Sequence, residues 1–103
     1  MKIREYIETT FDGTEKADML EEFSNIRENA VLIIEIQGCT GRAVTYPFPF
    51  QEDADEWETL YPADDDYARH VFRGKKEIQN IEFSGHGARS ALWKASLALG
   101  KLT

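Results

Sequence analysis

The last stretch of the chain, Ser84 to Leu102, constrains the fold most, because it predicts a helix with apolar side chains on two sides. From Ala88 to Leu99 it has no proline and no β-branched residue, and alanines and leucines recur at helical spacing. Gly100 is placed for a left-handed C-terminal cap. One stripe of small and apolar side chains allows close packing against a sheet. That stripe consists of Ala88, Ala91, Leu92, Ala95, Leu99 and Leu102.

Trp93 and Leu97 lie one turn apart on nearly the opposite side of this predicted helix. Two interpretations stay open. Either a loop from the middle of the chain covers Trp93, or the two side chains form a partner surface, such as the contact of a homodimer.

The length and composition predict a single domain over residues 1–103. The chain has 103 residues, 42% of them hydrophobic, which suffices for one core and is too short for two. No segment reaches the roughly 18 apolar residues of a membrane span, and the N-terminus lacks the apolar core of a secretory signal. The single cysteine, Cys39, excludes an intramolecular disulfide. We therefore expect a cytoplasmic protein without a membrane partner.

Charge is segregated along the chain. Residues 1–51 carry nine acids and five bases, residues 52–66 eight acids and no base, and residues 67–103 two acids and seven bases. The overall net charge of −7 disfavours non-specific binding to nucleic acid or anionic membranes, because such binding draws on clustered lysine and arginine. The charge suits a protein that meets basic surfaces.

The first half of the chain predicts two helices and a hairpin. Residues 2–11 fit a short helix better than a strand, although both remain open, and Thr14 to Glu28 predicts an amphipathic helix with Ala17, Leu20 and Phe23 inward. Ala30 to Ile36 is almost wholly apolar and predicts a central strand covered on both faces. After a glycine turn, Arg42 to Phe50 alternates as the second strand. Its two prolines imply that this strand either lies at a sheet edge at its far end or has already left the sheet there.

The second half of the chain predicts a short helix, a segment with two interpretations and a third strand. The acidic connection 51–66 contains Trp57, Leu60 and Tyr61 at helical spacing, which favours a short helix within it. Residues 62–74 fit either a helix that starts at Pro62 or a strand over Arg69 to Arg73. Lys76 to Phe83 predicts a third strand, with Ile81 and Phe83 inward. The expected fold is α+β: a small antiparallel sheet of three or more strands, packed by an N-terminal amphipathic helix and a C-terminal helix.

No residue pattern predicts a metal, a cofactor or catalysis. Asp64, Asp65 and Asp66 offer hard oxygen ligands and His70 an imidazole, which could hold a divalent cation. Successive helical residues point about 100° apart, so only two of the carboxylates could converge, and helix capping explains them better. His86 lies near serines in sequence only, without a third catalytic member that spacing identifies. We therefore expect a non-enzymatic protein.

Basic residues of the last third predict an alternative nucleic-acid interface. The set consists of Arg69, Arg73, Lys75, Lys76, Arg89 and Lys94. Gly85-His86-Gly87 before the last helix could place free N–H groups on a phosphate, although the glycine pattern is short. The competing interpretation, which we favour, is that the basic stretch neutralises the acidic segment within the same molecule.

Two resemblances concern the order of elements. Helix, strand, strand, strand and helix, with glycine and a basic residue at Gly87 to Ser90, resembles double-stranded-RNA-binding domains. More loosely, residues 14–102 resemble small acidic proteins of phages and other mobile elements, which have a sheet between helices and an Ala/Leu-rich last helix, here Ala91 to Leu99. The second resemblance implies an inhibitor of host defence, of the anti-CRISPR or anti-restriction type.

The leading hypothesis is a protein-interaction module that docks an acidic, nucleic-acid-mimicking segment onto a basic surface of a nucleic-acid-binding or defence protein. Carboxylates supply the charge line, and aromatic side chains supply buried contacts. The predicted partner-binding residues are Asp53, Asp55, Glu56, Trp57, Glu58, Tyr61, Asp64, Asp65, Asp66, Trp93 and Leu97. The alternative is a small nucleic-acid-binding module that uses the basic set.

Overall fold

A three-stranded antiparallel sheet organises the molecule. The computed structural model describes residues 1–103, and its strands are β1 (Val31–Gln37), β2 (Ala43–Phe48) and β3 (Tyr67–Arg73), in the order β2-β1-β3. The central strand is confirmed, because β1 pairs with both neighbours and its first six residues are buried. The hairpin and the edge position of the proline-containing strand β2 are confirmed as well.

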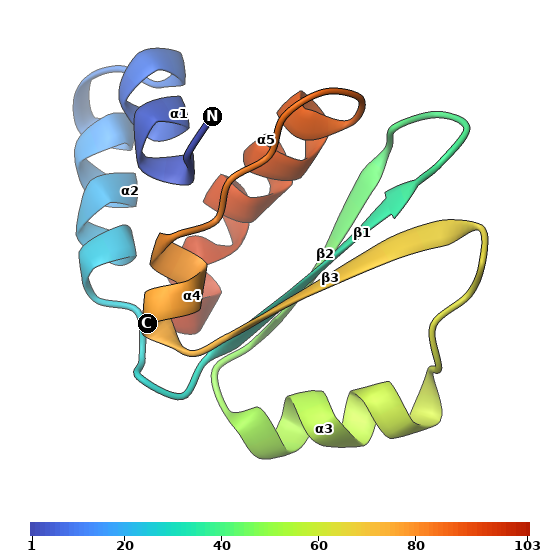
Figure 1. Cartoon of the computed structure of the whole chain (residues 1–103). Coiled ribbons are helices and arrows are strands. Elements are labelled where there is room, and N and C mark those ends of the chain that lie inside the picture. The colour runs from blue at the N-terminus through green and yellow to red at the C-terminus, as the bar shows by residue number, and fades with distance from the viewer.

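Helices cover both faces of the sheet unequally. Figure 1 shows α3 (Gln51–Leu60) alone on one side, and α1 (Ile3–Thr10), α2 (Gly13–Ser24) and α5 (Ala88–Ala98) on the other. The short helix α4 (Lys75–Gln79) follows β3, and a 3-10 turn, η1 (Leu99–Leu102), continues α5. The predicted α+β class is therefore confirmed. None of these helices has both the length and the apolar character that a membrane crossing requires.

The main core lies between the sheet and the larger helical layer. Leu32, Ile34 and Ile36 point from β1 into this layer, where α5 presents its predicted stripe, buried throughout except at Ala88, which is half-buried. The expected cap at Gly100 was wrong. This glycine does not adopt a positive φ, because the chain continues from α5 into η1, which buries Leu102.

The N-terminal helices differ from expectation in detail. Residues 3–10 are helical, which decides between the two predictions for this segment. The next helix begins after Asp12 and ends at Ser24, four residues before the predicted end. Met19 and Phe23 are its buried residues, whereas Ala17 is exposed. The helix is therefore rotated relative to the predicted stripe, because its larger apolar side chains face the core.

The predicted third strand at Lys76 to Phe83 was wrong, and the alternative over Arg69 to Arg73 is the strand that forms. Gly74 adopts a positive φ of 90° and redirects the chain from β3 into α4. Glu82 makes only an isolated bridge to Lys2, although Ile81 is buried as expected. The element order is therefore helix, helix, strand, strand, helix, strand, helix and helix.

Two glycines let the hairpin turn and the start of α5 touch. A Cβ on Gly87 would lie 2.8 Å from Cγ2 of Ile36, and one on Gly41 would lie 3.0 Å from the His86 ring. Both glycines also have positive φ, so a side chain at either position is disfavoured by space and by conformation. This contact fixes the first turn of α5 against the sheet.

Candidate partner-binding surface

Helix α3 is held to the sheet by one small and one large side chain. Ala54 is fully buried and clusters with Val31 and Ile33 of β1. Trp57, one turn later, packs its ring 4.5 Å from that of Tyr46 and 5.9 Å from that of Phe48 on β2. The helix predicted within the acidic connection therefore exists, and it lies flat on the sheet with a fixed orientation.

A nearly buried ion pair lies under this helix. Arg69 Nε contacts Glu35 Oε2 at 3.0 Å, and both side chains are only 11% exposed. The Arg69 guanidinium also lies 4.7 Å from the centre of the Trp57 ring, a cation–π contact. Burial raises the pKa of Tyr46, and the nearby negative charge of Glu35 raises this pKa further. The pair explains how a glutamate fits into the central strand.

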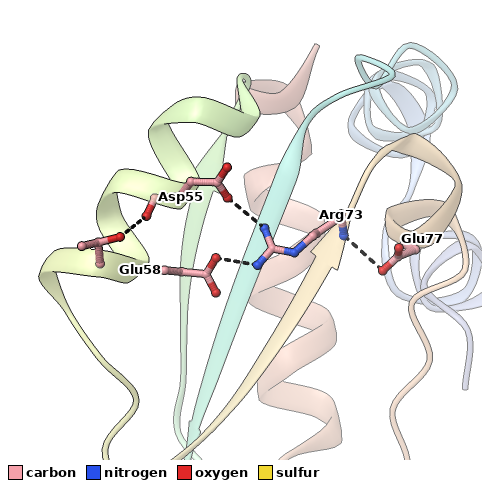
Figure 2. Close-up of polar contacts among 5 residues, drawn as sticks. Asp55, Glu58, Arg73 and Glu77 are labelled. Atoms are coloured by element: carbon pink, nitrogen blue, oxygen red, sulfur yellow. Dashed lines mark hydrogen bonds and ion pairs between the residues drawn. The ribbon is translucent and has the colours of Figure 1, made fainter.

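A second arginine connects β3 to two acids of α3. Figure 2 shows Arg73 directed at Glu58 and Asp55, with distances of 2.5 and 3.4 Å, while its main-chain N–H donates to Glu77 at 3.2 Å. The hydrogen bond to Glu58 raises the pKa of Arg73, so this arginine stays charged. The predicted intramolecular neutralisation of the acidic segment is thus confirmed for Arg73, and Asp55 and Glu58 are not free carboxylates.

The outward side of α3 carries acids without a basic neighbour in bonding distance. Glu52, Asp53 and Glu56 are exposed and form no ion pair. At the end of the helix Leu60 and Tyr61 are 65% and 57% exposed. Sequence reasoning did not include Glu52 or Leu60 in the partner-binding set, although their spacing on the helix could have placed them there.

The two predicted aromatic contacts of this surface have different positions. Trp57 is half-buried against the rings of β2 and the Arg69 guanidinium, so it supports the helix and presents little surface. Tyr61 packs against Trp57 with the ring centres 5.4 Å apart and remains largely exposed. Tyr61 is therefore the aromatic side chain that a partner can reach.

Asp64, Asp65 and Asp66 do not start a helix, so the predicted helix cap was wrong. They lie in an exposed turn that leads into β3, where Asp64 Oδ1 accepts from the Asp66 main-chain N–H at 2.8 Å. His70 lies on β3 with its ring 5.2 Å from Phe83. No group of three or more histidine, cysteine or acidic side chains is arranged to hold a metal ion.

Trp93 and Leu97 lie on the opposite side of the sheet from α3, so the acidic segment cannot cover them. They are 42% and 48% exposed, and Phe11 stacks on the Trp93 ring at 5.7 Å. The predicted cover from the middle of the chain was therefore wrong, because Phe11, the residue after α1, covers part of Trp93. A homodimer through these two residues stays a prediction.

The alternative nucleic-acid set is divided between the two sides of the sheet. Arg69 and Arg73 point toward α3 and are used in ion pairs, whereas Arg89 and Lys94 lie on α5 behind the opposite face. Lys75 and Lys76 lie on α4 after β3. The fold does not gather these residues into one basic surface.

Two hollows away from α3 were not predicted from the sequence. A depression of about 290 Å³ at the end of α2 is lined by acids, and burial, followed by Asp18 and Glu21, raises the pKa of Glu22 there. Because Asp18, Glu21 and Glu22 lie three and four residues apart, their helical spacing could have predicted this acidic depression. A larger cavity of about 410 Å³ lies between α1 and the start of α5, where Tyr6, Leu92 and Arg89 contribute to its wall.

Comparisons with protein-family models, curated proteins and solved structures found no match for this chain. The functional interpretation therefore rests on the geometry of the molecule alone.

Proposed function

We propose that this chain is a non-enzymatic interaction module whose acidic helix α3, with the following turn 61–66, binds a basic surface of a partner protein. The observation that carries the proposal is the outward row of Glu52, Asp53 and Glu56 on a helix held rigidly by Ala54 and Trp57. A fixed helix presents its charges without a further loss of chain entropy on binding. Tyr61 and Leu60 add exposed apolar surface at the end of the row.

The density of charge on α3 supports a partner that normally binds nucleic acid. Five acids occupy positions 52, 53, 55, 56 and 58 of the chain. At about 1.5 Å per helical residue this segment spans about 9 Å, or one carboxylate per about 2 Å, close to the charge spacing along duplex DNA. Arg73 neutralises part of this charge. We propose an inhibitor that occupies the phosphate-binding surface of a host nucleic-acid-binding or defence protein.

The test compares two variants with the same change of charge. One carries Glu52→Gln, Asp53→Asn and Glu56→Gln on α3, and the control carries Glu15→Gln, Asp18→Asn and Glu21→Gln on the exposed side of α2. Wild type captures its partner from a nuclease-treated lysate of its source cells, and the partner is identified by mass spectrometry. With the purified partner, we expect the α3 variant to associate about tenfold or more slowly at low salt, and the control much less so.

A second measurement separates mimicry from simple charge attraction. Duplex DNA should displace the chain from its purified partner, because both occupy one surface. Equal slowing by both variants would show that α3 is not the contact. Capture that disappears with nuclease treatment would overturn the proposal in favour of the nucleic-acid-binding alternative.

A further inference from the structure

The two edge strands of the sheet, β2 and β3, differ in how many of their outward main-chain groups are free. The hydrogen-bond pattern shows which main-chain groups face outward. In the β1–β2 pair, Gln37 donates to Arg42 O at 2.8 Å, which continues the bonded rungs onto the even-numbered residues of β2. The odd-numbered residues Ala43, Thr45 and Pro47 therefore direct their main-chain groups away from the sheet.

The outer edge of β2 is closed to further pairing. The Ala43 N–H donates to Ser90 Oγ of α5 at 2.9 Å, and Pro47 and the following Pro49 have no N–H. Only Thr45 keeps a free donor on this side. Prolines and capped donors are how proteins prevent an edge strand from recruiting another chain.

The middle of the outer edge of β3 has no proline and no capped N–H donor. Gly38 donates to Asp66 O at 3.3 Å and Gly74 to Ala30 O at 2.7 Å, so the rungs to β1 fall on the even-numbered residues of β3. Of the odd-numbered residues, Tyr67 donates to Asp64 O and Arg73 to Glu77. Arg69 and Val71 between them have no outward main-chain hydrogen bond.

We propose that β3 pairs antiparallel with the β3 of a second copy of this chain, which joins two sheets into one of six strands around a two-fold axis at His70. Arg69 of one copy then lies opposite Val71 of the other. These residues have the open N–H and C=O groups, so each exchanges both bonds with its counterpart. The free groups of the edge are therefore self-complementary.

Side-chain charge selects this register over its neighbours. A shift of two residues in one direction places Arg69 opposite Arg69 of the second copy, and a shift in the other direction places Arg69 opposite Arg73. Like charges directly opposite each other destabilise a strand pair. In the proposed register Arg69 faces Val71, Arg73 faces Tyr67, and His70 faces His70.

The charges that flank β3 favour the second copy as the occupant. Antiparallel pairing places the acidic turn 64–66 of one copy beside the start of α4 in the other, and symmetry repeats the contact. Asp65 of one copy then lies near Lys75 and Lys76 at the start of α4 in the other. In the single chain Asp65 and Lys76 are exposed and Lys75 is half-buried. The segregation of acids before β3 and bases after it thus has a direct use in pairing. This inference does not rest on the proposed function.

The test measures the mass of the purified chain by sedimentation across a wide range of protein concentration. We expect a reversible dimer of twice the 11.8 kDa chain mass. Val71→Pro removes an outward donor without removing a rung to β1, and should raise the dimer dissociation constant about tenfold or more. Thr45→Pro, the matched change at an outward position of β2, should leave it unchanged.

A charge exchange keeps the proposal testable if the proline variant does not fold. Asp65→Lys and Lys75→Glu should each weaken the dimer, and the double variant should restore it, because the opposed charges are complementary again. Amide exchange at Arg69 and Val71 should slow only at concentrations where the dimer forms. A monomer at every concentration, or a dimer that Val71→Pro does not weaken, would overturn the proposal.

Discussion

The two faces of the sheet are covered by different kinds of contact. On the face toward α1, α2 and α5, a cluster of 20 buried hydrophobic residues forms the main core. On the face toward α3, only three buried residues cluster, and aromatic rings and the Arg69–Glu35 pair complete the packing. The first face supplies most of the stability. The second fixes the position of an acidic helix with polar and aromatic contacts, which are sensitive to geometry and to pH.

The largest effect should come from a truncation in the main core. Ile34→Ala removes a fully buried side chain of β1 and should cost about 3–4 kcal/mol of unfolding free energy, because a cavity remains. Urea unfolding measures this loss. Val44→Ala, at a 42% exposed position of β2, is the control and should cost less than about 0.5 kcal/mol. Similar losses in both variants would contradict the division of the two faces.

On the α3 face, Arg69→Ala should lower the free energy of unfolding by about 3 kcal/mol. The change leaves Glu35 almost buried without its counter-charge and removes the contact with Trp57. The double variant Arg69→Met with Glu35→Leu should recover most of this stability. The comparison uses urea unfolding of both variants. A double variant as unstable as the single one would show that the apolar replacement cannot pack under α3.

Alkaline pH should loosen the α3 face before the core. The folded-state pKa of Tyr46 lies above its ordinary value because of burial and Glu35, so the neutral phenol is the form that the fold favours. The contribution of the neutral Tyr46 phenol to stability is complete at pH values below the ordinary tyrosine pKa. It is lost as the pH rises through the folded-state pKa. Trp57 fluorescence in a Trp93→Phe background reports the change. Tyr46→Phe should remove this pH step; an unchanged step would assign it to another group.

The smallest effect concerns charge crowding on α2. Burial and the neighbouring acids Asp18 and Glu21 raise the pKa of Glu22, so its ionised form opposes folding at neutral pH. Glu22→Gln should therefore raise the free energy of unfolding at neutral pH by about 0.2–0.5 kcal/mol, the size of one like-charge interaction on a helix. Below the ordinary glutamate range the gain should vanish, because the wild-type side chain is also neutral. Thermal unfolding at both pH values measures the difference, and a loss of stability at neutral pH would contradict it.

The parts of the fold that the sequence predicted are those with a local pattern. Ala30 to Ile36 is apolar on both faces because both faces of β1 are covered, and the alanine stripe of α5 packs on the sheet. β3 has no such pattern. Its two arginines are neutralised by Glu35 and Glu58, which come from distant elements, and no spacing within residues 67–73 shows those partners.

The candidate surface was predictable in charge and less so in detail. The run of acids indicated the segment, and helical spacing at Trp57 and Tyr61 indicated its conformation. Which acids remain free depends on Arg73, whose position follows from the pairing of β3 with β1. Sequence alone therefore could not separate Asp55 and Glu58 from Glu52, Asp53 and Glu56.

The close contact of Gly41 with the start of α5 has a consequence for the order of folding. The hairpin of β1 and β2 can form from neighbouring residues, but α5 can dock only after its turn exists, since Gly87 fits against Gly41 and Ile36. These partners are almost half the chain apart, so closing that loop costs entropy before the contact contributes. The last helix should therefore be the late-folding part of the molecule, and the main core remains open to water until it arrives.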